Sequence, residues 1–189
     1  MELVEADMIE ECICEDISIE NFEQELQMAQ EMIKFSVSKG GIGLSAPQVG
    51  VYKKMFVWMV NEREFQVVFN PIYFKDGSKK IRTIEGCLSY PEQEFFMERY
   101  KHVRAVFYTP FMVYNPAEEV RLKKITKKLS GEKSIIFQHE TQHLSGITIA
   151  LRGESVDEDK RVGVAFGFKK ETGDSLMIAE ELKNAQNQQ

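Results

Sequence analysis

The sequence predicts an α+β fold in which mixed, mostly antiparallel sheets pack around a central helix that carries the motif His-Glu-x-x-His. Apolar runs rich in β-branched and aromatic residues follow one another between residues 54 and 129 without an intervening helical pattern, which favours antiparallel pairing. Helical spacing of apolar residues flanks these runs on both sides. The chain has 189 residues and no internal repeat, so we expect a single domain over residues 1–189.

The first predicted helix begins near Asn21, which together with Gln24 has the pattern of a capping box. Its apolar stripe at helical spacing consists of Phe22, Leu26, Ala29, Ile33 and Val37. The glycine pair at residues 40 and 41 supplies a stop, because glycine readily adopts the left-handed conformation that ends helices. We expect this helix to pack on a sheet.

Five runs have the composition of strands, and they follow a loop expected over residues 41–50. The predicted strands are residues 54–60, 65–69, 81–89, 102–108 and 119–129. Asn70-Pro71 is expected to end the second of them, since this dipeptide typically marks a turn. The third carries Cys87.

The helix that bears the motif is expected to begin after a Ser130 cap and to run to about Leu144, where Ser145-Gly146 ends it. Beyond it, residues 162–168 have the composition of a strand. Residues 175–185 have the pattern of a terminal helix, with Asp174 as its cap.

Composition and charge exclude several classes of protein. No apolar run reaches the roughly 18 residues of a membrane span, and the acidic N-terminus lacks the basic start and apolar stretch of a secretory signal. We therefore expect a cytoplasmic protein, in which cysteines are more often buried, catalytic or metal-bound than disulfide-bonded. The net charge of −6 argues against DNA binding. The basic run at residues 121–128 is interpreted as a solvated strand face in preference to an RNA-contacting patch.

The sequence Gln-His-Glu-Thr-Gln-His at residues 138–143 has the pattern of a metal-dependent hydrolase. On a helix, His139 and His143 lie one above the other on the same face, so both imidazoles can reach one ion. Glu140 then projects beside the ion, where it can take a proton from water as the general base. Taken alone, so short a motif also arises by chance on amphipathic helices, and its histidines are then ordinary polar or core residues.

A catalytic metal site usually needs three protein ligands and one open position for water. No histidine follows His143, so the third ligand of one common class of zinc protease is absent. Cys87 is the candidate instead, because it follows a glycine that lets the backbone approach a ligand closely.

Three separated segments together resemble the peptide deformylase family. They are residues 41–48 (Gly-Ile-Gly-Leu-Ser-Ala-Pro-Gln), residues 85–89 (Glu-Gly-Cys-Leu-Ser) and residues 138–143, the last followed by Leu144 and Gly146. The resemblance covers about residues 21–147, and the C-terminal segment after about residue 147 is divergent. Three motifs in the right order and spacing are far harder to obtain by chance than any one of them.

The resemblance implies hydrolysis of the N-formyl group from formyl-methionine at the N-terminus of nascent polypeptides, with release of formate. Glu140 would take the proton of the attacking water and deliver it to the departing amine. The side-chain amide of Gln48 and the backbone N–H of Leu88 would stabilise the developing oxyanion. By analogy with the family, the ion would be Fe²⁺, with Zn²⁺ or Ni²⁺ as alternatives.

For the substrate, an N-formylmethionyl peptide, the resemblance implies two kinds of contact. The backbone around Ile42, Gly43 and Leu44 would pair with the extended peptide as an added strand. Ile135 and Ile136 would join Ile42 in lining a pocket for the methionine side chain, although simple core packing is the alternative for one of the two. A transient contact with the ribosome is consistent with such a substrate.

Gln142 and Ser45 are among the departures from the family pattern. Gln142 stands where aspartate is usual, so the buried network with Arg99 and Glu85 loses a charge, and we expect Glu85 to become the main partner of Arg99. Ser45 replaces a common alanine. It is interpreted as a conservative small residue rather than a nucleophile, because no catalytic histidine is free to activate it.

Two other functions stay open at this point. A metallopeptidase built on the His-Glu-x-x-His helix would not need Cys87. A deformylase-like protein with impaired catalysis could serve as a binding module, with Gln142 as its mark. Retention of Gln48, Cys87 and Glu140 favours an active enzyme.

Overall fold

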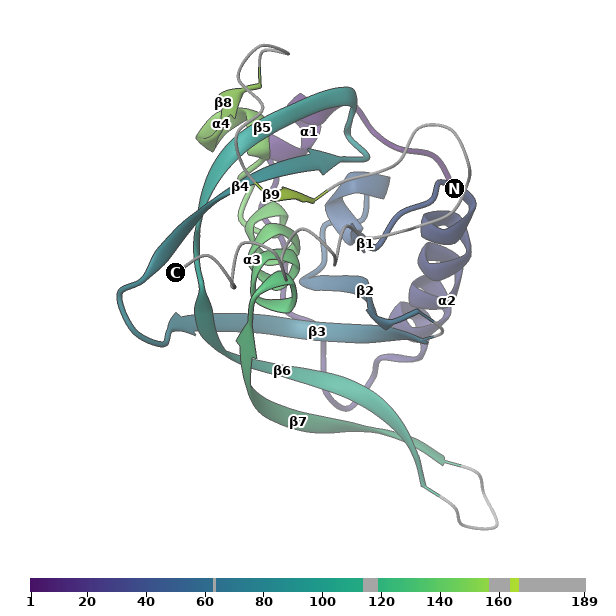
Figure 1. Ribbon diagram of the computed structural model, residues 1–189. Helices are drawn as coiled ribbons and strands as arrows, with labels where there is room; N and C mark the ends of the chain where they lie inside the picture. Colours follow the sequence, from purple (N-terminus) through teal and green to yellow (C-terminus); the bar gives the residue numbers. More distant parts are fainter. Residues whose placement is uncertain (63, 114–118, 157–163, 167–189) are drawn as a thin grey trace.

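Two β-sheets enclose helix α3 (Glu132–His143) in the computed structural model, which describes residues 1–62, 64–113, 119–156 and 164–166 (Figure 1). The larger sheet has the order β1 (Gly43–Ser45), β2 (Met55–Asn61), β3 (Glu64–Lys75), β6 (His102–Val113) and β7 (Glu119–Ser130). The smaller sheet has the order β8 (Glu154–Ser155), β5 (Tyr90–Tyr100), β4 (Lys80–Cys87) and β9 (Val164–Phe166). Among the described strands, neighbours pair antiparallel except β4 and β9, which are parallel. The predicted α+β class is confirmed.

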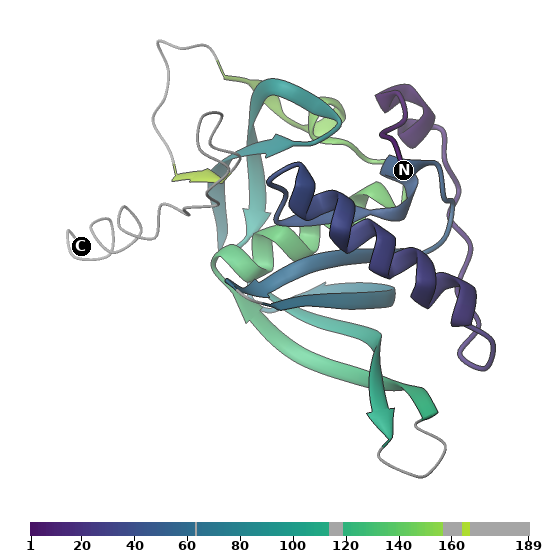
Figure 2. The ribbon, with the colours of Figure 1, turned by 90° about the vertical axis from the view of Figure 1, so that its right-hand side faces the viewer.

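Helix α2 (Glu23–Ser38) covers the opposite face of the larger sheet from α3 (Figure 2). Successive side chains of a strand point to opposite faces, and β2 is apolar on both. Phe56 and Trp58 therefore pack in the cluster around α3, whereas Met55 and Val57 pack with Ala29 of α2. The remaining helical elements are α1 (Ala6–Glu10), the 3₁₀ turn η1 (Ala46–Val49) and α4 (Ile149–Arg152).

Helix α3 is buried on most of its surface because it contacts strands of both sheets. Phe137 anchors its middle: the ring centroid lies 5.3 Å from that of Phe56, 5.8 Å from Trp58 and 5.6 Å from Phe107. All four side chains are buried. Removing a buried aromatic ring costs about 3–5 kcal/mol, so this cluster holds the helix firmly against the larger sheet.

Gln138 fixes the rotation of α3 relative to β5. Its Nε2 donates to the carbonyl of Tyr100 at 2.9 Å, and its Oε1 accepts from the N–H of Tyr100 at 3.0 Å. One turn earlier, the hydroxyl of Ser134 donates to the same carbonyl at 2.9 Å. These bonds leave residues 139, 140 and 143 to face the space between β1 and β4.

The structure corrects the prediction at both ends of α2. Asn21 and Gln24 form no capping box, because the N-cap is Phe22 without a side-chain hydrogen bond, and the N–H of Asn21 donates to Ser18 Oγ at 3.2 Å instead. Val37 is 56% exposed and does not belong to the buried stripe. The buried residues of α2 are Ala29, Met32 and Ser36.

The predictions for the sheets were also wrong at three places. The expected loop at 41–50 contains β1 and η1. The strand expected to end at Asn70-Pro71 continues to Lys75, because an irregularity in register between Phe69 and Ile72 accommodates the pair. Strand β5 was not predicted, since charged residues interrupt its apolar alternation.

The predictions for the C-terminal part of the chain were correct at some elements and wrong at others. Ser130 is the last residue of β7, and the N-cap of α3 is Gly131, whose φ of 57° is costly for other residues. Helix α3 ends where predicted, and the exposed lysines of the basic run lie on edge strand β7. Strand β9 falls within predicted strand 162–168, whereas the predicted helix 175–185 lies outside the described residues.

No helix in the described part of the chain is long and apolar enough to cross a membrane.

Candidate metal centre and active site

The side chains of Cys87, His139 and His143 converge between the two sheets. Cys87 ends β4, and the two histidines lie one turn apart on α3. One potential ligand atom from each residue lies within 4.8 Å of the others. The Sγ atom of Cys87 is 3.4 Å from Nε2 of His143. Both of these side chains are buried, and that of His139 is only 11% exposed.

These separations fit a metal ion held by three ligands. In a tetrahedral site, metal–sulfur bonds of about 2.3 Å and metal–nitrogen bonds of about 2.0–2.1 Å place adjacent ligand atoms about 3.5 Å apart. The 3.4 Å between sulfur and imidazole nitrogen agrees with this geometry. One thiol and two imidazoles suit a divalent transition metal, and three protein ligands leave one position for water.

A buried ion pair orients His139. Its Nδ1 lies 2.9 Å from Oε2 of Glu85, which leaves Nε2 for the ligand cluster. Arg99 donates to both oxygens of Glu85, through Nε at 2.7 Å and Nη2 at 2.6 Å. Its Nη1 donates to Oε1 of Gln142 at 2.6 Å. The structure thus brings the predicted second layer together, with Glu85 as the charged partner of Arg99.

The surroundings of His139 favour a positive charge on it, whereas those of His143 keep that imidazole neutral. Burial alone would raise the pKa of Glu85, but the Arg99 guanidinium holds it well below its usual range. Burial alone would lower the pKa of His139, but hydrogen bonds with Cys87 and Glu85 outweigh it and raise that pKa to about 10. Burial lowers the pKa of His143, so its imidazole is neutral and offers a lone pair.

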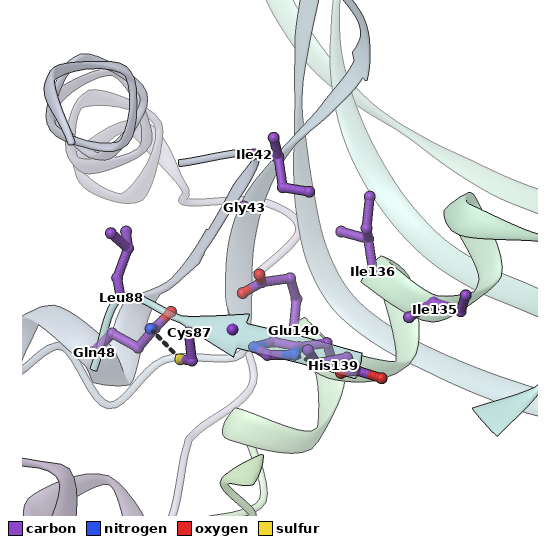
Figure 3. A pocket seen from close by; sticks show the side chains of 11 residues that line it. Ile42, Gly43, Gln48, Cys87, Leu88, Ile135, Ile136, His139 and Glu140 are labelled. Carbon is purple, nitrogen blue, oxygen red and sulfur yellow. Dashed lines mark hydrogen bonds and ion pairs between the residues drawn. The ribbon is translucent and has the colours of Figure 1, made fainter. Parts of the chain in front are cut away.

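The carboxylate of Glu140 lies against β1. Its Oε2 accepts a hydrogen bond from Ser45 Oγ at 2.5 Å. Figure 3 shows the carboxylate pointing toward the backbone at Gly43. Burial raises the pKa of Glu140, although positive charge on His139 and the Ser45 hydrogen bond oppose the rise. A raised pKa makes a carboxylate a stronger base, which takes a proton from water more readily.

The amide of Gln48 is held in one orientation. Its Oε1 accepts from the N–H of Ser45 at 2.9 Å, so Nε2 points the other way. There it donates to Cys87 Sγ at 3.3 Å, drawn as a dashed line in Figure 3, and to Ser89 Oγ at 3.0 Å. Leu88, in the turn after β4, lines the same pocket. The predicted oxyanion donors therefore lie on the side of the pocket nearest Cys87.

Apolar side chains line the opposite part of the pocket. Ile42 precedes β1, and Ile135 with Ile136 lies on the first turn of α3. Both isoleucines of α3 line the pocket as well as being buried. The side chain of Leu44 is fully buried in the cluster beneath α2, so only its backbone belongs to the β1 side of the site.

The sequence containing this site matches a known family. Residues 8–159 match the family model described as polypeptide deformylase. The chain belongs to the peptide deformylase family. The matched residues include the three candidate ligands, as well as Glu140 and Gln48.

Several deformylases resemble this chain in sequence or structure. Peptide deformylase 1B, chloroplastic, of Oryza sativa subsp. japonica is 34% identical over 173 residues, which are 88% of this chain but only 61% of that protein. Peptide deformylase of Thermotoga neapolitana is 32% identical over 135 residues, covering 71% of this chain and 76% of the relative. A Plasmodium falciparum deformylase structure has a TM-score of 0.69 at 31% identity, covering 81% of this chain and 86% of that one. Since one of these relatives is chloroplastic, the cytoplasmic location stays a prediction.

Several polar contacts of this site were not predicted, among them the bond from Ser45 to Glu140 and the bond from Gln48 to Ser89. Recognition of residues 43–45 as a strand would have placed Gly43 and Ser45 on one face, but only the packing of β1 against α3 brings that face to Glu140. The sequence offers no comparable signal for Ser89.

Proposed function

We propose that this chain is a metal-dependent deformylase that removes the formyl group from the N-terminal formyl-methionine of nascent polypeptides and releases formate. The observation that carries the proposal is the convergence of a Cys, His, His ligand set with a buried glutamate in one pocket of a deformylase-family chain. Water is the second reactant. The formyl carbon gains the oxygen atom of the water, the bond between this carbon and the amide nitrogen breaks, and the nitrogen gains a proton.

The metal would be held by Cys87, His139 and His143, with Fe²⁺ expected and Zn²⁺ or Ni²⁺ as alternatives. When bound, a divalent ion supplies Lewis acidity, which lowers the pKa of water and polarises the formyl carbonyl. Glu85 supports this role, because its bond to Nδ1 fixes the ring of His139.

Glu140 would move the proton. It is buried beside the ligand cluster, and burial raises its pKa, which makes the carboxylate a stronger base. The carboxylate takes a proton from the attacking water and then donates it to the amine nitrogen as the C–N bond breaks. One group thus serves as base and then as acid, which balances protons over the cycle.

Gln48 and Leu88 would bind the oxygen that gains negative charge. The Nε2 of Gln48 is oriented before substrate arrives, because Oε1 already accepts from the Ser45 N–H. The backbone N–H of Leu88 would be the second donor, and the residue borders the same pocket. Donors fixed in advance lower the barrier because they need no reorganisation during the reaction.

The substrate would lie along β1 with its methionine side chain between Ile42 and the two isoleucines of α3. In the described part of the chain, β1 pairs with β2 on one edge and ends the sheet on the other. An extended peptide can add to such an edge through backbone hydrogen bonds. The apolar lining of Ile42, Ile135 and Ile136 suits an unbranched thioether side chain.

Formate release from formyl-Met-Ala-Ser tests this function. The chain, loaded with Fe²⁺ under exclusion of oxygen, should release one formate for each new amino terminus. Glu140→Gln, which keeps the shape but loses the base, should retain metal and lose most turnover, by a factor on the order of 10² or more. Cleavage of internal peptide bonds, or metal binding without formate release, would reject the proposal.

A further inference from the structure

One face of β1 contacts both groups that carry the proposed chemistry. Gly43 and Ser45 lie two residues apart on this short strand, so they share a face, while Leu44 points into the core beneath α2. This face is turned toward Glu140. From the same residue, the N–H of Ser45 donates to Oε1 of Gln48 at 2.9 Å. Ser45 therefore touches the proposed base and the proposed oxyanion donor.

The hydroxyl of Ser45 makes the closer of these contacts. Its Oγ lies 2.5 Å from Oε2 of Glu140 and 3.0 Å from the carbonyl oxygen of the same residue. A hydroxyl carries one proton, and a carboxylate accepts hydrogen bonds more strongly than an amide carbonyl. Ser45 is fully buried and Glu140 is 5% exposed, so water competes little for this bond.

The two oxygens of Glu140 therefore have different surroundings. A Cβ atom built on Gly43 would overlap Oε1, which shows that Oε1 rests directly over the bare backbone of β1. Gly43 lines the substrate pocket, whereas Oε2 is turned to Ser45, which does not. Of the two oxygens, Oε1 is therefore the one that adjoins Gly43 of the pocket lining.

We propose that Ser45 is a positioning residue that holds Oε2 of Glu140 and so reserves Oε1 for proton exchange with water and with the departing amine. The inference rests on the proposed function. A free glutamate side chain would sample several rotamers, and each misplacement of the proton-accepting oxygen lowers the fraction of productive encounters. Alanine, which is common at this position in the family, offers no donor.

Ser45 is not itself a nucleophile in this arrangement. Its side chain is fully buried and lies outside the pocket lining, so it cannot reach a formyl carbon. Both imidazoles nearby belong to the candidate metal ligands. The hydroxyl therefore acts through Glu140.

Ser45→Ala tests the proposal by its effect on kcat, KM and metal content. We expect kcat for formyl-Met-Ala-Ser to fall by about tenfold, a fraction of the full contribution of a general base. KM should stay within about twofold and the metal content should not change, because neither the pocket lining nor a ligand is altered. Thr109→Val is the control, since this half-buried hydroxyl donates to the carbonyl of Val67 at 2.8 Å and does not line the pocket. It should lower the melting temperature and leave kcat unchanged.

A double-mutant cycle in the metal-free protein measures the contact without relying on activity. Ser45→Ala should lower the melting temperature of the parent chain. This shift should be smaller in a Glu140→Ala background, where the hydroxyl keeps only the carbonyl of residue 140 and its part in the η1 cap. If Ser45→Ala fails to fold, Ser45→Cys replaces it, because a thiol has similar volume and is a weak donor.

The outcomes separate this inference from the function on which it rests. Absence of formate release by the parent chain would reject the function, while the melting cycle would still report on the Ser45–Glu140 contact. An active parent whose Ser45→Ala variant keeps full kcat would overturn the positioning role. The role is also overturned if KM or metal content changes in parallel with kcat, or if the melting shift is as large without the Glu140 side chain as with it.

Discussion

The two walls of the site are held in place by different kinds of interaction. On the wall formed by β4 and β5, Glu85 and Arg99 are a buried ion pair, 2% and 1% exposed, that orients a candidate metal ligand. On the wall formed by β1 and η1, the polar contacts come from a hydroxyl, an amide and backbone N–H groups, and they reach Glu140 and Gln48. The first wall carries Cys87 and orients His139 of α3, whereas the second wall contacts Glu140 of α3 and carries Gln48.

This difference predicts separable effects of mutation. A buried charge left without its partner is expensive, so changes at Glu85 or Arg99 should lower stability and metal affinity together. Neutral hydrogen bonds contribute less to stability, so changes on the β1 wall should lower turnover while the fold and metal persist. Substitutions on each wall can therefore test whether one wall mainly determines stability and metal affinity and the other mainly determines turnover.

Glu85→Gln should have the largest effect. The amide cannot balance the buried guanidinium of Arg99, so we expect a loss of about 3–5 kcal/mol in the free energy of unfolding. Metal content should fall as well, because His139 loses the acceptor at its Nδ1. Denaturant unfolding and metal analysis check both. Glu98→Gln is the control, since its ion pair with Lys80 is exposed and should matter little. Unchanged melting and metal content in Glu85→Gln would show that the two walls do not differ in this respect.

Gln48→Ala should lower kcat by about 10²–10³-fold, the usual effect of removing one oxyanion donor. The fold should persist with a loss of only about 1 kcal/mol in the free energy of unfolding, because the Ser45 N–H at the start of η1 loses its acceptor. Steady-state kinetics together with metal analysis measure the two effects separately. If the variant loses its metal in proportion to its activity, Gln48 supports metal binding and does not act as an oxyanion donor.

Gly43→Ala should lower kcat by about 10²-fold with little effect on melting. The new Cβ would overlap Glu140 Oε1 and lie 2.9 Å from Cδ, so the carboxylate must move away from the pocket. A displacement of about 1 Å in a reacting group can cost this much. Calorimetry and kinetics on the same preparation provide the check. Full activity would mean that Oε1 is not the oxygen that exchanges the proton.

Gln142→Met should have the smallest effect of these changes. It removes the acceptor of Arg99 Nη1 at 2.6 Å but leaves both bonds from Arg99 to Glu85. The expected loss in the free energy of unfolding is about 1–2 kcal/mol, typical of one hydrogen bond to a charged group. Denaturant titration of both variants, Gln142→Met and Glu85→Gln, measures the difference between their free energies of unfolding. A loss as large as that of Glu85→Gln would show that the neutral residue carries as much of the network as the charged one.

The parts of this molecule that the sequence predicted are those with local signals. The His-Glu-x-x-His helix and the motif around Cys87 have fixed spacing, so the ligands could be named before their convergence was known. Strand β1 was missed because three residues, the first of them glycine, are too few to show an alternation of apolar and polar residues, although pairing with β2 makes them a strand. The contact from Ser45 to Glu140 joins residues 95 positions apart, and only the packing of β1 against α3 creates it. Capping at Ser130 failed for the opposite reason, because a strong local signal gave way to continuation of β7.

The optical spectrum of the chain titrated with Co²⁺ shows whether the three candidate ligands hold a metal ion together. If Cys87, His139 and His143 bind one ion, one equivalent should produce a sulfur-to-cobalt charge-transfer band along with the visible bands of a tetrahedral site. Replacement of Cys87 with Ser should abolish the charge-transfer band while the visible bands shift. A chain that binds cobalt without any charge-transfer band would show that the sulfur of Cys87 is not a ligand, and would contradict the proposed site.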